Sequence, residues 1–72
     1  MGRFRFFFFS REERRPHVHI EGPSGEAKFW VEPEVELAFA WGFSARIVRR
    51  LEGVVHERRR EIRQAWQEHF GS

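Results

Sequence analysis

Apolar and polar residues alternate with a period of two along four stretches in the first half of the chain. Such alternation is typical of strands that bury one face of a sheet. The stretches cover residues 3–9, 17–21, 26–32 and 35–40. Between the second and third, the residues Gly-Pro-Ser-Gly at 22–25 have the types that tight turns require. This pattern predicts a small antiparallel sheet of three to four strands.

The second half of the chain has the period of an α-helix. Ser44 suits an N-cap and Gly71 suits a helix end, so we expect one helix over about residues 45–70. The apolar positions of this segment share one stripe at 100° per residue: Ile47, Val48, Leu51, Val54, Val55, Ile62, Ala65 and Trp66. The predicted fold class is therefore α+β, a single domain over residues 1–72 with one long C-terminal helix packed on one face of the sheet.

The predicted helix is longer than the sheet that it covers. About 26 helical residues span about 39 Å, whereas a strand of five or six residues spans about 17–20 Å. The overhanging part would carry Ile62, Trp66 and Phe70, whose exposure is unfavourable. We expect a protein partner or a second copy of the chain to cover them. The alternative is a break near Gly53 that folds the last turns back.

Composition and charge narrow the class of protein. The 72 residues include nine Phe and three Trp but no Cys, so disulfides and thiolate metal sites are excluded. The aromatic run at 6–9 is too short for a membrane span or an export signal, and we expect a soluble, cytoplasmic protein without membrane contact. Residues 1–15 carry a net charge of +3, residues 16–43 carry −4, and residues 44–72 carry +3. Twelve of the thirteen basic residues are Arg, which favours contacts with carboxylate or phosphate.

Alternation gives the predicted sheet two different faces. The apolar face should pack against the helix and carries Phe4, Phe6, Phe8, Val18, Ile20, Ala27, Phe29, Val31, Leu37 and Phe39. The other face combines cations with rings and carries Arg5, Phe7, His17, His19, Lys28 and Trp30, among others. Because a single helix covers one face, we expect this second face to be bare and to be the working surface of the protein.

Three interpretations of the second face remain open. It could be the ordinary solvated side of an antiparallel sheet, although exposed rings such as Phe7 and Trp30 are then unexpected, or a binding face, or a catalytic or metal site centred on His17 and His19. His17 and His19 point the same way on one strand and are candidate catalytic residues, an acid–base pair suited to RNA cleavage. The same pair could supply two ligands to a metal ion, but no third ligand is fixed by the sequence, and no cofactor is assigned.

The binding interpretation requires no chemical reaction. Arg5, Phe7, Lys28 and Trp30 are candidate binding residues, since rings stack on bases or fill a partner's pockets while cations meet phosphate or carboxylate. Arg58 joins them, because it falls inside the apolar stripe of the helix, where an unpaired charge is costly.

Several short motifs occur in order along the chain. They are Arg5-Phe6-Phe7-Phe8-Phe9-Ser10, Pro16-His17-Val18-His19-Ile20, Glu26-Ala27-Lys28-Phe29-Trp30-Val31-Glu32-Pro33, Gly42-Phe43-Ser44 and Trp66-x-x-His69-Phe70-Gly71. Over nearly the whole chain they resemble the small bacterial proteins of domain-of-unknown-function family 4160. The loop at 11–16 departs from the polar turn and two prolines that family members often have there.

Proteins of that family are commonly encoded beside a second small protein, of domain-of-unknown-function family 2442. The resemblance therefore implies a component of a bacterial toxin–antitoxin-like two-gene module, with a toxin acting on RNA or its machinery as one role. Two alternatives stay open. One is a non-enzymatic adaptor or nucleic-acid-binding module, and the other is a metal-binding protein that uses His17 and His19.

Overall fold

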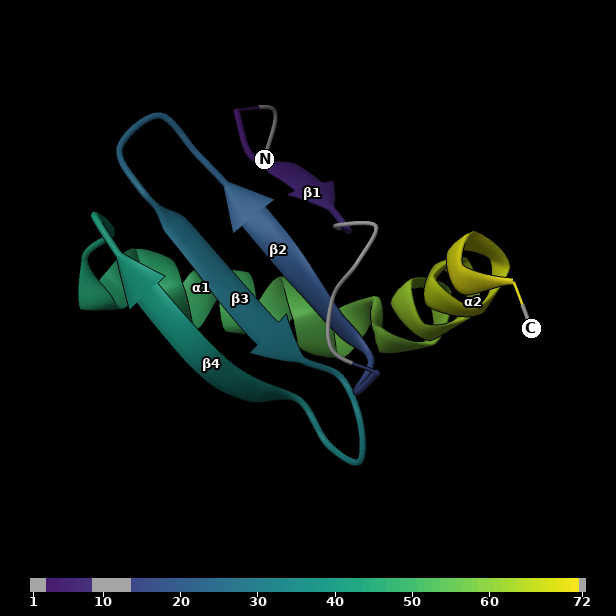
Figure 1. Cartoon of the computed structure of the whole chain (residues 1–72). Helices are drawn as coiled ribbons and strands as arrows, with labels where there is room; N and C mark the ends of the chain where they lie inside the picture. The colour runs from purple at the N-terminus through teal and green to yellow at the C-terminus, as the bar shows by residue number, and fades with distance from the viewer. Residues whose placement is uncertain (1–2, 9–13, 72) are drawn as a thin grey trace.

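The computed structural model describes residues 3–8 and 14–71 and confirms the α+β class (Figure 1). Its elements are β1 (Arg5–Phe7), β2 (His17–Glu21), β3 (Glu26–Trp30), β4 (Glu36–Trp41), α1 (Ala45–Glu57) and α2 (Arg59–Phe70). The four strands form one antiparallel sheet in the order β1-β2-β3-β4, so each strand lies beside its neighbour in sequence. The first strand is shorter than its pattern predicts, although part of the predicted range lies outside the described residues.

The apolar face of the sheet packs against α1, as predicted. The buried cluster combines residues of the sheet and of α1 with one residue from the C-terminal segment beyond α1: Val18, Ile20, Ala27, Phe29, Val31, Leu51, Val55 and Ile62. Helix α1 begins where its sequence predicts, because the hydroxyl oxygen of Ser44 accepts a hydrogen bond from the Ile47 amide at 3.2 Å. This cap satisfies one of the backbone donors that a helix leaves unpaired in its first turn.

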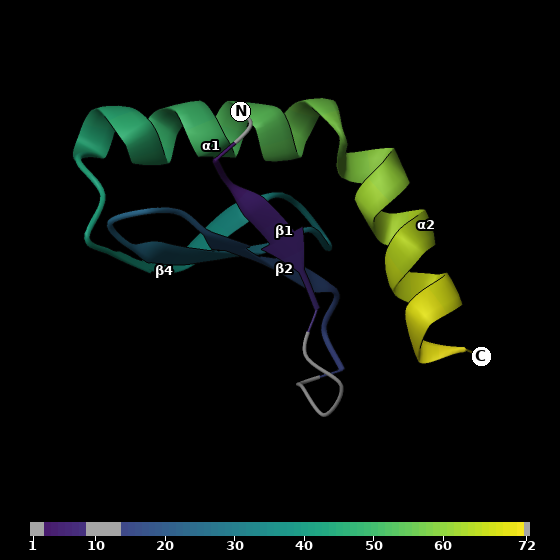
Figure 2. The same ribbon diagram turned by 90° about the horizontal axis from the view of Figure 1, so that it is seen from above.

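The prediction of one long helix is wrong, because the helix breaks at Arg58 and continues in a new direction as α2 (Figure 2). Gly53, where a break was considered, lies inside α1. The side chain of Arg59 holds the bend. Its Nε donates to the carbonyl oxygen of Val31 at 2.7 Å, and its Nη2 donates to that of Pro33 at 2.8 Å. The last turns therefore do fold back, but five residues beyond Gly53.

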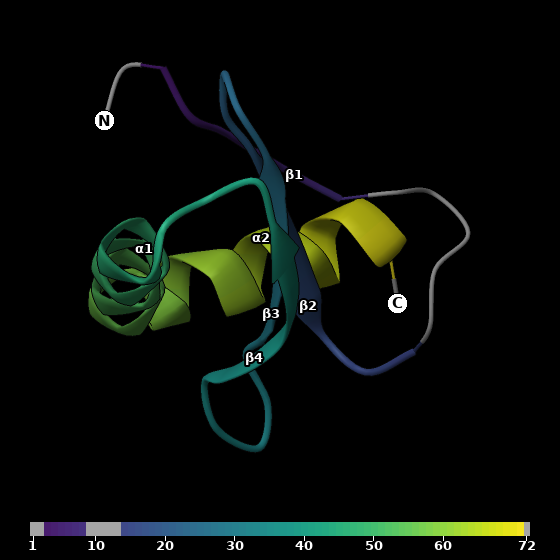
Figure 3. The same cartoon turned by 90° about the vertical axis from the view of Figure 1, so that its left-hand side faces the viewer.

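Helix α2 passes the end of the sheet, so the two helices do not share one face. Figure 3 shows α1 on one side of the sheet and the end of α2 on the other. Ile62 and Trp66 are buried within the chain, and Phe70 is half-buried. The exposed apolar surface that led us to expect a partner on this helix is thus largely covered by the chain itself. The partner remains an untested prediction.

A bulge in β4 corrects the assignment of one aromatic residue. Lys28 pairs with Phe39 and Phe29 pairs with Leu37, so Ala38 is an extra residue on β4. The extra residue moves Phe39 to the second face, beside Lys28, rather than to the apolar face where alternation alone placed it. Ala40, which packs against the core cluster, takes the inward position instead.

Two glycines offer opposite tests of this fold. A Cβ at Gly53 would meet no atom within 4 Å, whereas a Cβ at Gly25 would collide with the backbone of Trp41 and Gly42. We predict that Gly53→Ala raises the free energy of unfolding by about 0.5–1 kcal/mol, because it removes a flexible residue from a helix interior. Gly25→Ala should lower it by about 1–3 kcal/mol.

Urea denaturation of both variants checks this pair of predictions. A destabilising Gly53→Ala would mean that the helix needs a break at Gly53 after all, and a neutral Gly25→Ala would contradict the close approach of the β2–β3 turn to the end of β4.

Candidate functional site

The sheet brings four of the predicted site residues together on its second face. His17 pairs with Trp30 and His19 pairs with Lys28 across β2 and β3, so the four form two adjacent rows. Phe7 on β1 extends the second row, opposite His19. Alternation along the strands therefore predicted the face of these side chains correctly, and the register places them beside one another.

The expectation that this face is bare is wrong for its centre. The exposed fractions of His17, His19 and Lys28 are 0%, 4% and 8%. The reason is the bend at Arg58, which carries α2 round to this side of the sheet and places Trp66 against His17. Their ring centroids are 4.7 Å apart. Residues that were expected to face solvent are instead part of the interior.

The two imidazoles lie in a continuous ring cluster. The centroid of His17 is 5.2 Å from that of His19 and 5.4 Å from that of Trp30. Phe7 stacks on His19 with centroids 5.5 Å apart and an interplanar angle of 22°. Edge-to-face and stacked arrangements of this kind stabilise buried rings beyond the area that they remove from water.

A hydrogen bond orients His17 within the cluster. Its Nδ1 lies 2.6 Å from the carbonyl oxygen of Arg15. Because a carbonyl oxygen only accepts, Nδ1 carries the proton and donates it. His17 thereby fixes the segment that enters β2, a role for which burial is an advantage. A general acid or base has to reach its substrate, which the 0% exposure of this ring does not allow in the described conformation.

Cations of the chain itself already contact the rings that were predicted to bind a ligand. Lys28 Nζ and Arg15 Cζ each lie 4.4 Å from the centroid of the Trp30 ring, and Arg5 Cζ lies 4.7 Å from that of Phe7. These are cation–π distances. Trp30 and Phe7 are thus engaged inside the protein, which leaves less of each ring for a base or a partner.

The charges near this face are largely matched. Arg5 pairs with Glu21 at 3.1 Å, Arg15 pairs with Glu36 at 2.9 Å, and Arg63 pairs with Glu32. In the part of the chain that the structure describes, no group of three His, Asp or Glu side chains is arranged to hold a metal ion. The acid–base and metal interpretations of His17 and His19 stay predictions that this geometry does not favour.

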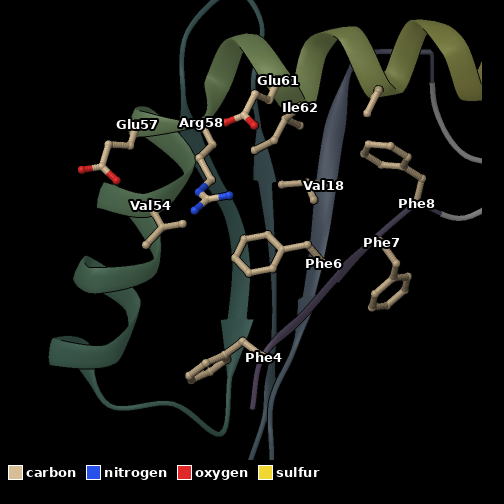
Figure 4. Close-up of a pocket in the computed structure, with 11 residues that line it drawn as sticks. Phe4, Phe6, Phe7, Phe8, Val18, Val54, Glu57, Arg58, Glu61 and Ile62 are labelled. Carbon is tan, nitrogen blue, oxygen red and sulfur yellow. The ribbon is translucent and has the colours of Figure 1, made fainter. Parts of the chain in front are cut away.

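A more accessible site lies mainly on the apolar face of the sheet, in a groove between β1 and the bend of the helices (Figure 4). Its volume is about 600 Å³, and its apolar lining includes Phe4, Phe6, Phe8, Val54, Ile62 and Ala65. We call it the β1 groove. It forms because α1 contacts β3 and β4 and α2 contacts β2, so the helices stop short of the edge strand.

Two of the predicted binding residues line the β1 groove: Phe7, whose ring also stacks on His19, and Arg58. The guanidinium of Arg58 extends between Val54 and Phe6, and Glu61 lies at the rim (Figure 4). Within residues 3–8 and 14–71, no carboxylate forms an ion pair with Arg58. The sequence singled out this arginine and assigned Phe4, Phe6 and Phe8 to the core. Phe4 and Phe8 do pack against the core cluster, whereas Phe6 is 37% exposed, and the groove that all three line was not predicted. The available signal was the position of their strand, since a first strand in a meander lies at the sheet edge.

The burial of Trp66 against His17 can be tested by mutation. Trp66→Ala should lower the free energy of unfolding by about 3–5 kcal/mol, because Trp66 is only 8% exposed and its removal takes away one ring that both His17 and Phe8 pack against. Trp41→Ala is the matched control, and it should cost less than about 1 kcal/mol because that ring is 60% exposed. Equal losses in chemical denaturation at one low protein concentration would contradict the packing of α2 on the second face.

In the described residues, no helix has the length and apolar character needed to cross a membrane.

Comparison with known proteins gives one family. No curated protein and no solved structure matches the chain significantly. The model of a domain of unknown function, DUF4160, matches residues 3–67, which is almost the entire chain and includes the β1 groove and the buried ring cluster. The chain therefore belongs to the DUF4160 family.

Proposed function

We propose that this protein is the partner-binding component of a bacterial toxin–antitoxin-like two-gene module, and that it acts by protein–protein contact rather than by catalysis. The observation that carries the proposal is the β1 groove, in which an exposed guanidinium lies among apolar side chains. The proposed partner is the protein of domain-of-unknown-function family 2442 that commonly accompanies members of this family.

The chemistry of the groove indicates what kind of segment fits it. Phe4, Phe6 and Phe8 offer ring surface, and Phe6 is 37% exposed. Burying such rings against an apolar partner is favourable, and aromatic and arginine side chains are the ones that dominate interface energies. Arg58 adds a requirement for an anionic group, because covering its charge without a counter-ion is costly. The partner segment should therefore present apolar side chains next to an Asp or Glu.

The edge position of β1 supports the same proposal. In the described part of the chain β1 pairs only with β2, so its outer backbone groups are open to a partner strand. Addition of a strand at an edge supplies main-chain hydrogen bonds, while adjacent pockets supply specificity. The β1 groove lies directly against this edge.

The alternatives receive less support from the geometry. A toxin that cleaves RNA through His17 and His19 needs access to rings that are 0% and 4% exposed. A nucleic-acid-binding face needs unmatched cations and free rings, whereas Arg5 and Arg15 are ion-paired and Lys28 lies over Trp30. A partner-binding role in the β1 groove requires neither exposed histidines nor a face of unmatched cations and free rings.

Substitutions in the groove test the proposal by co-purification. Expressed with the protein encoded beside it, the chain should retain that protein on an affinity column. Arg58→Ala should weaken the affinity by about tenfold, because a charge-assisted contact to the partner's carboxylate is lost, and Phe6→Ala should weaken it further. The dissociation constant of the purified pair is the measurement.

Arg49→Ala serves as the matched control, since Arg49 is an exposed arginine of α1 outside the groove. Its affinity should equal that of the original chain. An equal loss for Arg49→Ala and Arg58→Ala would indicate general charge attraction and would refute the groove as the binding site.

The histidines allow a separate test against the catalytic alternative. We expect that the double substitution His17→Gln, His19→Gln lowers the thermal stability, because both rings are buried in the ring cluster. Any effect of the chain on growth should then follow the amount of folded protein. If the double variant keeps its stability and its yield but no longer affects growth, the result would favour catalysis and contradict the partner-binding proposal.

A further inference from the structure

The two edges of the sheet differ in how well they are protected against pairing with another chain. An exposed edge strand offers unpaired backbone groups, and proteins usually guard it by shortness, charge, proline or a cover. The edge strand β1 has only three residues, so it has room for a short partner segment but not for extended pairing with a whole strand. The other edge, β4, has six residues, Glu36–Trp41, and contains neither a basic residue nor a proline.

Strand β4 is also apolar where it meets solvent. Leu37, Phe39 and Trp41 are 41%, 42% and 60% exposed. With Phe6 they are the large hydrophobic residues most exposed in the described part of the chain, and three of the four lie on this one strand. Its protective features are the bulge at Ala38 and the charge of Glu36 at its start, which is already paired with Arg15 of the same chain.

We propose that β4 pairs with β4 of a second copy of this chain, antiparallel and about a two-fold axis, so that two four-stranded sheets become one. Antiparallel pairing makes an edge complementary to itself, because each copy offers the other the same donors and acceptors. The same axis keeps Phe39 and Trp41 of both copies on one face of the joined sheet, where rings of neighbouring strands contact each other.

The charges at the two ends of β4 favour a second copy in this orientation. Glu34 lies just before the strand, whereas Arg46 and Arg49 lie in the first turns of α1, which follows the strand after a short turn. All three side chains are exposed. Antiparallel pairing brings the acidic start of one β4 towards the basic end of the other, while parallel pairing would bring like charges together.

This interface is distinct from the partner-binding site proposed above. Strands β1 and β4 are opposite edges of the sheet, so the β1 groove stays open when two β4 strands pair. The module would then present two grooves per dimer. Failure of one proposal leaves the other intact, and the experiments can tell them apart.

Sedimentation of the full chain tests the proposal directly. Between about 1 µM and about 200 µM, the weight-average mass should rise from 8.8 kDa towards twice that value. Phe39→Lys should raise the dimer dissociation constant by at least about tenfold, because the two-fold axis introduces the charge twice. Leu37→Glu should do the same, and circular dichroism checks that both variants keep the fold.

Phe6→Lys is the matched control, with a ring of similar exposure on the opposite edge, and it should dimerise like the original chain. As a second measurement, the outward amides of β4 should exchange hydrogen more slowly at the higher concentration, and those of β1 should not change. A mass of 8.8 kDa at all concentrations, or a dimer that Phe6→Lys disrupts and Phe39→Lys does not, would overturn the proposal.

Discussion

Arg59 donates hydrogen bonds to the carbonyl oxygens of Val31 and Pro33, and this contact determines which helix covers each face of the sheet. The two carbonyls follow the last residues of β3 and would otherwise need water or another donor. By satisfying them, Arg59 ties the start of α2 to the end of the sheet and turns the helix away from its original axis. Helix α1 can then cover one face while Trp66, two turns later, reaches the other. A straight helix would leave His17 exposed and Trp66 in solvent.

The elements of this fold that depend on local patterns could be read from the sequence. Alternation located β2, β3 and β4, the turn residues located the β2–β3 hairpin, and Ser44 marked the start of α1. The break at Arg58 could not be read in this way. Arginine has a good intrinsic helix propensity, and the apolar stripe continues at helical spacing through Ile62 to Trp66. The bend comes from hydrogen bonds between residues about 28 positions apart, which no local pattern contains.

The candidate site was predictable to the same extent and for the same reason. Period-two alternation correctly put His17, His19, Lys28 and Trp30 on one face, and the register makes them neighbours. Whether that face was bare depended on α2 and therefore on the bend. The bulge at Ala38 was equally hidden, because alanine is accepted in a regular strand, in a bulge and in a helix. The sequence therefore predicted which residues lie next to one another, but not which of them are exposed to solvent.

The motifs that carry the family resemblance meet in one place in the structure. His17, Trp30 and Trp66 come from three of these motifs, and the rings of both tryptophans contact the ring of His17. Phe8, from a fourth, lies edge-on to Trp66, with centroids 5.5 Å apart. In a chain of 72 residues without disulfides, such a cluster is a second core, and it holds α2 against the sheet. An unusual combination of histidine, lysine and tryptophan can therefore reflect the demands of folding. Features that folding does not need, such as Arg58 in the β1 groove and the exposed apolar residues at the edge of β4, are then the better guides to what the protein binds.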